Sequence, residues 1–489
     1  MQKGGNTMPQ KDDYLGRRHE RREAARKKRE AESRRIKRTL LAAVLALAVC
    51  GVAFYNLTKD ILPEKPEKEQ VQETVTVPTE ESRPTTPVQK DPITTIHIRA
   101  AGDLNVTDSV VNSGVYVGGF DFHKPLRDVG AILSSADLTV MNFEGNIYGE
   151  PYGTQNTSAP IELLQALRNY GVDLIQMANS CAINNGLNGL TATLNAIRSV
   201  GLEPVGAFAN EQELKESKGY TITEVQGIKV AFVAFTKGLG GRGLPAGSEN
   251  LVNLLYTDYA TEYKEIDRDR ITNILKNVET EKPDITIALL HWGSEYNEDT
   301  SKTQNTIISL MQKQGVDVII GTHPHVVQPI VFDESAGTLV AYSLGDFFGD
   351  AERGATNYSI VLDVEITKDA NAGTTRVTGY SYEPIFTVKE GESHGNRERK
   401  VVRISKAMEA YDENFLDRIT DSADAAMDKA LTRIDERIAV MQEVECPSCG
   451  KAVTVYAITA PEKAGMLVSD AKCRCGEILP AGSNVKDYD

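Results

Sequence analysis

Five short apolar runs, each ending in a carboxylate, amide or imidazole side chain, constrain the fold of this chain more than any other feature. They end at Asp103, Glu144, Asn179, His291 and the loop that holds His323 and His325. Short, nearly continuous apolar runs are typical of strands buried on both faces of an α/β sheet. Because the ligands of such sheets bind beyond the carboxyl ends of the strands, we expect these ends to meet at one site.

The last of these ends carries two histidines in Gly321–Ile330, which reads Gly-Thr-His-Pro-His-Val-Val-Gln-Pro-Ile. Pro324 favours extended backbone at the residue before it, so His323 and His325 should point to the same side. Paired imidazoles after a buried strand indicate a metal-binding loop, and ordinary loop histidines are the alternative.

Helical and strand patterns alternate through the first part of the main domain, which we expect to span residues 93–390. The predicted helices cover residues 124–134, 161–169, 188–200, 259–278 and 303–314. Later segments read as strands without helices between them, at residues 326–332, 339–342, 358–366 and 375–387. This order predicts an α/β sandwich that finishes in antiparallel strands.

Charge is distributed unevenly along the 489 residues, whose net charge is −15. Residues 1–38 carry 14 Lys or Arg against 6 Asp or Glu, a net +8, which leaves −23 on the rest. A basic arm of this kind is expected to lie at the inner face of the cytoplasmic membrane. The acidic remainder argues against nucleic acid as a partner.

Residues 39–57 are apolar and uncharged, and nineteen helical residues would just cross a bilayer core of about 30 Å. They predict a single-pass anchor with a cytoplasmic N-terminus and an extracellular main domain, joined by a disordered linker over residues 58–92. A cleaved signal peptide and a lipoprotein modified at Cys50 are the alternatives. The long charged leader and the bulky Val49 before Cys50 favour the uncleaved anchor.

Beyond the main domain, the chain reads as one amphipathic helix over residues 403–443 and a small tail over residues 444–489. Apolar residues three or four apart produce the helical pattern. The tail holds Cys446-Pro-Ser-Cys449 and Cys473-Arg-Cys475, two short turns that fit a zinc-ribbon-like structural zinc site. Two disulfides are the alternative on the extracellular side of a membrane.

Six ordered motifs over roughly residues 95–390 together resemble the CapA family of capsule and poly-γ-glutamate synthesis proteins. The motifs are Gly102-Asp103, Asp137–Glu144, Ala178-Asn179 with Gly186, His291–Glu295, Gly321–Pro329 and Tyr342–Phe347. That family looks like a branch of the calcineurin-like metallophosphoesterases. The resemblance therefore implies an α/β/β/α sandwich that holds two divalent metals.

The resemblance also implies which residues form the site. The implied metal ligands are Asp103, Glu144, Asn179, His291, His323 and His325. The three histidines would also be the catalytic residues, and the ligands would be supported by Asn142, Glu295 and Asp346. Imidazole, carboxylate and amide ligands suit Mn²⁺, Zn²⁺ or Fe.

The chain departs from the family pattern at two places. Where the family reads Asn-Asn-His and then Asp, this chain has Asn179-Ser180-Cys181 and then Asn184, and Asp346 stands where the family commonly has Asn. A thiol serves phosphate poorly as a proton donor.

Two functions therefore stay open. The first is an assembly factor that supports capsule or poly-γ-glutamate synthesis or export beside membrane-bound synthesis and export proteins. The second is a metal-dependent hydrolase that acts on a phosphate ester or an anionic polymer. Cys181 is the residue that separates them.

Overall fold

A computed structural model describes residues 92–394, 399–457, 465–467, 471–480 and 482–488 of the chain. The predicted basic arm, the predicted anchor over residues 39–57 and all but the last residue of the predicted linker lie outside these ranges. Among the described residues, no helix is both long enough and apolar enough to cross a membrane.

The first of two large sheets is built around β1 (Ile93–Asn105), which pairs in parallel with β4 (Leu138–Glu144). Two further parallel strands extend the sheet on that side, β5 (Leu174–Gln176) and β6 (Glu203–Val205). The other side is antiparallel and consists of β14 (Tyr358–Asp369), β15 (Thr374–Val388) and β16 (Lys400–Arg403), while the short β13 (Asp346–Phe348) pairs with the end of β1. The sheet thus finishes in antiparallel strands, as the sequence predicts.

The second sheet has six strands and is parallel at its centre. Its order is β11 (Ile330–Asp333), β12 (Thr338–Ala341), β10 (Val318–Thr322), β9 (Ile285–His291), β8 (Ile228–Thr236) and β7 (Thr221–Val225). Each edge strand, β11 and β7, is antiparallel to its neighbour. The central strands are fully buried apolar runs, which explains why they read as covered strands in the sequence.

Alternate residues of β8 show how the two sheets are stacked. Val230 and Phe232 belong to a large core that also contains the buried residues of the first sheet. Val233 and Phe235 point the other way, into a separate core formed with α7 (Arg268–Thr280) and α8 (Lys302–Gln312). The second sheet therefore has one face on the first sheet and the other under helices.

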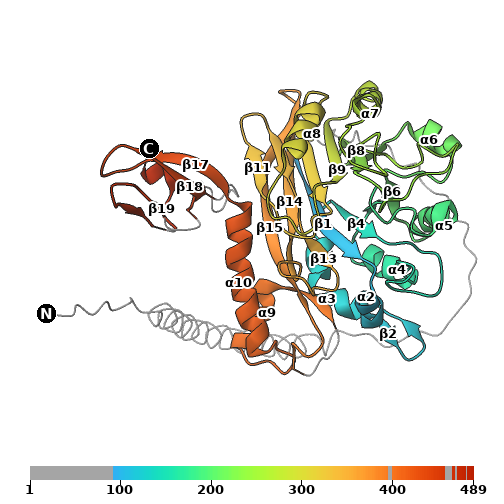
Figure 1. Ribbon diagram of the computed structural model, residues 1–489, viewed down its shortest axis with the longest axis horizontal. Helices are drawn as coiled ribbons and strands as arrows, with labels where there is room; N and C mark the ends of the chain where they lie inside the picture. The colour runs from blue at the N-terminus through green and yellow to red at the C-terminus, as the bar shows by residue number, and fades with distance from the viewer. Residues whose placement is uncertain (1–91, 395–398, 458–464, 468–470, 481, 489) are drawn as a thin grey trace, which may run out of the picture. The chain divides into compact units, whose positions relative to one another are not determined.

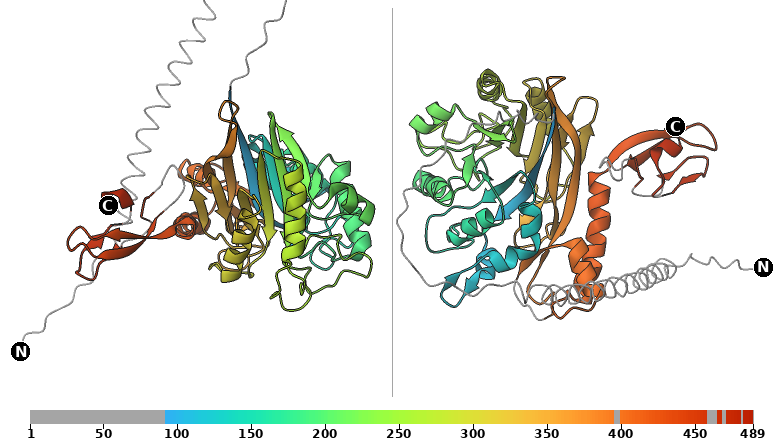
Figure 2. Two further views of the ribbon diagram at one scale, coloured as in Figure 1. Left: turned by 90° about the horizontal axis from the view of Figure 1, so that it is seen from above. Right: turned by 180° about the vertical axis from the view of Figure 1, so that it is seen from behind.

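The outer face of the first sheet is covered by further helices. These are α3 (His123–Leu133), α4 (Glu162–Asn169) and α5 (Gly186–Ser199), whose buried leucines join the large core. Two shorter helices, α2 (Asp108–Ser113) and α6 (Glu211–Ser217), complete the domain. The layers run helix, sheet, sheet, helix (Figure 1, Figure 2), which is the predicted α/β/β/α sandwich.

Three element boundaries differ from the sequence predictions. The helix expected from residue 259 begins at Arg268, because the Asp258 carboxylate accepts hydrogen bonds from the backbone of Lys264 and Glu265 and closes a turn first. The strand expected from residue 326 begins only at Ile330. In place of one helix over residues 403–443 there are two, α9 (Ile404–Asp412) and α10 (Asp421–Ile438).

The break between α9 and α10 has a local cause. Asn414 has a φ of 60°, a left-handed conformation that ends a helix, and the Thr420 side chain then caps α10 by accepting a hydrogen bond from Ala423 N. The apolar face of α10, including Met427 and Ile434, packs into the core of the main domain. The amphipathic pattern of residues 403–443 therefore reflects packing against the main domain.

The C-terminal tail has a small core of its own. A hairpin of β17 (Val440–Glu445) and β18 (Ala452–Ala457) lies beside a second, shorter pair, β19 (Ala471–Lys472) and β20 (Ile478–Leu479). The buried core members are Val444, Cys446, Val453, Val455, Leu467, Cys473 and Leu479. Among the described residues of the tail, these seven make a small core for an independent unit, so a further crosslink is expected to stabilise it.

Candidate metal centre

The register of the parallel strands brings the predicted site residues together. In the first sheet, Asp103 of β1 lies opposite Asn142 of β4, and Asn105 lies opposite Glu144. In the second sheet, Thr322 at the end of β10 lies opposite His291 at the end of β9. Because these carboxyl ends come to the same edge of the sandwich, their polar side chains share one buried pocket.

Asn142 connects the residues of the first sheet. Its amide nitrogen donates to Asp103 Oδ1 at 2.6 Å and lies 3.5 Å from both Glu144 Oε1 and His291 Nδ1. Asn179 Nδ2 donates to Asn142 Oδ1 at 3.1 Å, while Asn179 Oδ1 accepts from Cys181 N at 3.0 Å. Asn142 is thus hydrogen-bonded to Asp103, and the oxygen of Asn179 is held by its own loop.

The histidines come from the second sheet and face these carboxylates. His325 Nδ1 lies 2.8 Å from Asp346 Oδ1 and 3.5 Å from Asp103 Oδ2. His291 Nδ1 lies 3.9 Å from Glu144 Oε1. The rings of His291 and His323 have centroids 4.5 Å apart. All six implied ligands are therefore brought into one pocket, and their role as ligands stays a prediction.

The backbone of the histidine loop differs from the expected extended form. His323 and His325 have φ angles of 91° and 61°, both in the left-handed region that L-residues rarely adopt. His323 N donates to Asp103 Oδ2 at 3.0 Å, so the carboxylate of β1 holds this unusual turn in place. The strain at the two histidines is typical of a functional loop.

Three groups of side chains place their ligand atoms within 4.8 Å of one another. They are Asp103 with Glu144 and His291, Asp103 with His325 and Asp346, and Glu295 with His323 and His325. Asp103 is common to the first two groups, so these are adjacent candidate groups that share one carboxylate. Asp346 is therefore close enough to be a ligand as well as a support.

Glu295 lies next to the histidine loop. Its carboxylate groups with His323 and His325. Its side chain is exposed, while Asp103 and Glu144 are buried. Glu295 thus lies at the solvent side of the pocket.

Two buried imidazole nitrogens support a cation in the pocket. His291 Nε2 and His323 Nδ1 have no hydrogen-bond partner among the described residues. A buried polar atom left unpaired costs about 1–3 kcal/mol, so native proteins rarely keep one without a ligand or ion. Neutral imidazole nitrogens and carboxylate oxygens are donors that suit a divalent transition metal.

The pKa values of the pocket residues also favour a bound cation. Burial, followed by the charge of Asp103, raises the pKa of Glu144 to about 8, and burial raises the pKa of Asp103 to about 6. Burial lowers the pKa of His323 to about 3 and that of His291 well below its ordinary value. For His325, burial is outweighed by Asp346 and the other carboxylates, so its pKa is raised. Neutral His291 and His323 are the forms that bind metals.

Some pocket residues were missed from the sequence. Asn105 donates to Asp346 Oδ1 at 2.9 Å, and Ser180 Oγ donates to Glu144 Oε2 at 2.8 Å. Lys237 follows β8, whose last residue lies opposite His291. The signal for Lys237 was present, because β8 is another apolar run that ends in a charged residue. Trp292, by contrast, is fully buried, as expected for a packing residue.

A cleft of about 620 Å³ opens beside the pocket. It is lined in part by Tyr296 and Val326 and by two arginines of α10, Arg433 and Arg437. The Tyr296 ring stacks on His325, with centroids 5.5 Å apart, so the cleft is continuous with the histidine loop. A long ligand would have room on that side of the pocket.

Close backbone packing fixes the histidine loop and yields a prediction. A Cβ added at Gly321 would overlap the carbonyl oxygen of Tyr342 and approach Trp292 Nε1 to 2.5 Å. We expect Gly321→Ala to destabilise the fold by about 1–3 kcal/mol or more, as overpacking does. Urea unfolding should show this loss. Gly243→Ala, where a Cβ would meet open space, is the control and should unfold like the wild type.

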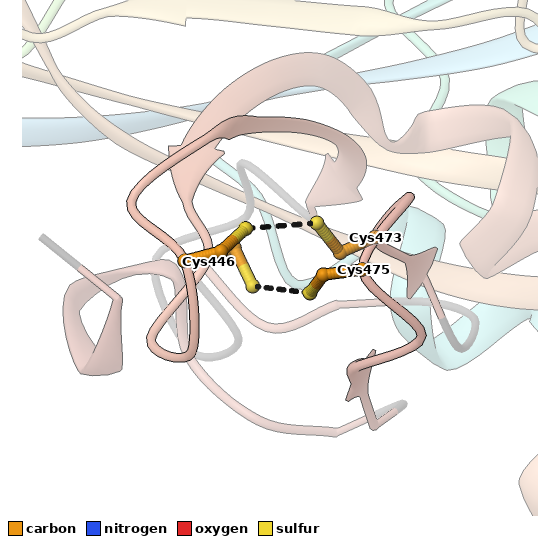
Figure 3. A group of neighbouring side chains, drawn as sticks. Cys446, Cys473 and Cys475 are labelled. Carbon is orange, nitrogen blue, oxygen red and sulfur yellow. Dashed lines mark hydrogen bonds between the residues drawn. The ribbon is translucent and has the colours of Figure 1, made fainter.

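The four tail cysteines form a second candidate site. Sγ of Cys446 lies 3.6 Å from that of Cys475, and Sγ of Cys449 lies 3.5 Å from that of Cys473. These separations exceed the disulfide length of about 2.0 Å, and they are near the edge of about 3.8 Å expected for a tetrahedron of thiolates around zinc. Figure 3 shows thiols from two separate turns directed at one another. All four sulfurs lie within 4.8 Å of each other.

Comparison with known proteins gives a match over the main domain. A family model described as bacterial capsule synthesis protein PGA_cap matches residues 97–351, which include every candidate ligand of the pocket. The PGA biosynthesis protein CapA of Bacillus subtilis (strain 168) is 28% identical over 246 residues, or 49% of this chain and 60% of that protein. The capsule biosynthesis protein CapA of Bacillus anthracis is 26% identical over 253 residues, or 50% and 58%.

These matches cover only part of each protein. The chain spans about 60% of the length of the curated relatives it matches. Helices α9 and α10 and the cysteine tail lie outside the matched residues. Among solved structures, the calcineurin-like phosphoesterase YfkN of Bacillus subtilis has a TM-score of 0.38 and 16% identity, covering 70% of this chain and 98% of that one. A TM-score of this size describes only a distant likeness.

Proposed function

Because the chain belongs to the bacterial capsule synthesis protein family PGA_cap, we propose that it supports the synthesis or export of capsule or poly-γ-glutamate. The polymer is anionic and assembled at the cell surface. The observation that supports the proposal is the pocket itself, where six residues from five strand ends lie together. Its role in this proposal is to hold a divalent cation to which the polymer or its precursor binds.

The chain's own residues would hold Mn²⁺, Zn²⁺ or Fe in this pocket. Asp103, His291 and His325 would be direct ligands, and Asn142 would fix Asp103 through its 2.6 Å hydrogen bond. A divalent cation there would supply a Lewis acid that neutralises an anionic oxygen and lowers the pKa of bound water. The cleft lined by Tyr296, whose ring stacks on His325, would receive an extended polymer chain.

Cys181 favours the assembly role over hydrolysis. Burial, followed by the charge of Glu144, raises the pKa of the Cys181 thiol to about 12, and its Sγ lies 3.9 Å from Glu144 Oε2. Such a thiol keeps its proton at neutral pH and is a poor general acid, because efficient proton donors have pKa values near the working pH. The alternative function is a metal-dependent phosphoesterase, which the unpaired nitrogens of His291 and His323 favour.

The proposal includes a place in the cell. Residues 39–57 would anchor the chain in the cytoplasmic membrane with the main domain outside, next to membrane-bound polymer synthesis and export proteins. The four thiols of the tail would bind one structural Zn²⁺. Residues 1–38 would remain in the cytoplasm.

The experiment that tests the function measures surface polymer and hydrolysis together. In cells that make the polymer but lack this protein, the wild-type chain should restore surface polymer, and Asp103→Asn should not. Purified wild-type chain should not hydrolyse bis(p-nitrophenyl) phosphate with Mn²⁺ present. Hydrolysis that His323→Ala abolishes would select the phosphoesterase. Restoration by Asp103→Asn as complete as by the wild type would contradict a role for the pocket.

A further inference from the structure

A glycine-rich loop, residues 237–247, begins where β8 ends, and the last residue of β8 lies opposite the implied ligand His291. Its first residue is fastened to the pocket, since Lys237 N donates to the carbonyl of His291 at 2.8 Å. Lys237 Nζ donates to Gly293 O at 2.6 Å and lies 4.8 Å from the centroid of the Tyr263 ring. An ammonium has three donors, so Lys237 is held in place with donors to spare.

The tip of the loop lies against the other side of the pocket. Gly240 and Gly241 have φ angles of 61° and 75°, which turn the chain back so that Arg242 N donates to Leu239 O at 3.1 Å. A Cβ at Gly240 would lie 3.1 Å from Arg242 Nη1 and 3.4 Å from Ser180 O. The Arg242 guanidinium and the Ser180 segment therefore both border Gly240.

The contacts of the loop place its two cations at different parts of the site. Lys237 is held beside His291 and Gly293, and the Arg242 guanidinium and Ser180, the residue before Cys181, both border Gly240. One loop thus brings an ammonium to the histidine side of the pocket and a guanidinium to the Cys181 side.

We propose that Lys237 and Arg242 form an oxyanion-binding pair that holds a phosphoryl or carboxylate group of the substrate against the metal pocket. The inference rests on the proposed metal site and adds the group that orients the ligand. Both side chains are suited to it: a guanidinium binds oxyanions through two parallel donors, and a partly buried ammonium acts as a nearby point charge. Arg242 would supply the positive donor that the neutral Cys181 thiol lacks.

Phosphate binding to the full-length protein loaded with Mn²⁺ tests the pair. Isothermal titration with inorganic phosphate should show affinity reduced about tenfold in Lys237→Gln and in Arg242→Gln, and about a hundredfold in the double variant, as expected for lost charge-assisted hydrogen bonds. Manganese content should stay at the wild-type value. Arg242→Lys keeps the charge but loses the two parallel donors, so its phosphate affinity should lie between those of the wild type and Arg242→Gln. Lys276→Gln, which changes an exposed lysine on α7, should leave the affinity unchanged.

The outcomes separate this inference from the proposed metal site. Wild-type protein that binds no manganese would refute the metal site and the pair with it. Two results would refute the pair alone, provided that manganese binds normally. They are equal phosphate affinity in the wild type and the double variant, and no phosphate binding by either. A parallel titration with acetate identifies the group: losses confined to phosphate indicate a phosphoryl ligand, and equal or larger losses with acetate indicate a carboxylate. Thermal unfolding of each variant shows whether a loss of phosphate affinity is caused by misfolding.

Discussion

Replacing both His323 and His325 with alanine should remove the divalent cation from the main domain of the full-length protein. Both imidazoles are buried in the pocket, and His325 is shared by two of the three groups that could hold a cation. Changing a residue that merely supports a metal ligand lowers affinity about 10–100-fold, so loss of two direct ligands should exceed a hundredfold. Elemental analysis after equilibration with Mn²⁺ measures the effect.

The control is His123→Ala. His123 is outside the pocket, where its Nδ1 pairs with Asp121 at 2.8 Å on the protein surface, so its loss should leave manganese unchanged. A second readout guards against misfolding. Because a cation that binds only the folded state stabilises it, added Mn²⁺ should raise the melting temperature of the wild type and leave that of the double variant unchanged. Equal manganese in wild type and double variant would refute the site.

Part of the pocket could be predicted from the order of the strands. Parallel neighbours end together, which puts Asp103 and Glu144 at one edge of the first sheet and His291 beside Thr322 at the edge of the second. The side-chain pattern of a buried strand is local, and so it can be read from sequence. The α/β/β/α layers follow from the same pattern with the intervening helices.

Other features depend on tertiary contacts, which cannot be predicted from a local sequence pattern. The left-handed turn at His323 exists because Asp103, far away in sequence, accepts its backbone N–H. The helix break at Asn414 is a single backbone conformation within a continuous apolar pattern. Glu295 follows His291 closely in sequence yet groups with His323 and His325, because the chain turns at Gly293, where φ is 75°.

Lys237 shows a different reason for a miss. Its strand, β8, ends beside His291 just as the other site strands do, but a lysine is not a metal ligand and was not counted among the polar ends. Charged residues that are not metal ligands can also follow strands at that edge of the sheets, and Lys237 is one of them.

Removing the metal from the tail should expose about four additional reactive thiols, whereas a reducing agent alone should expose none. The four sulfurs lie within 4.8 Å of each other, and Cys446 and Cys473 are buried in the core of the tail. Zinc held by four thiolates protects them from a thiol reagent until a chelator removes the metal. Titration with Ellman's reagent before and after chelation measures the difference.

Cys473→Ser should abolish this zinc and unfold the tail. The described part of the tail has a core of seven buried residues, and binding of structural zinc contributes about 10–16 kcal/mol in small zinc domains at neutral pH. The expected result is the loss of one zinc per chain together with rapid proteolysis after residue 440. Ser448→Ala is the matched control, since it removes only the 2.6 Å hydrogen bond to Glu477 from the same turn and should keep the zinc. If the protein contains no zinc and a reducing agent exposes the thiols, the tail instead holds two disulfides.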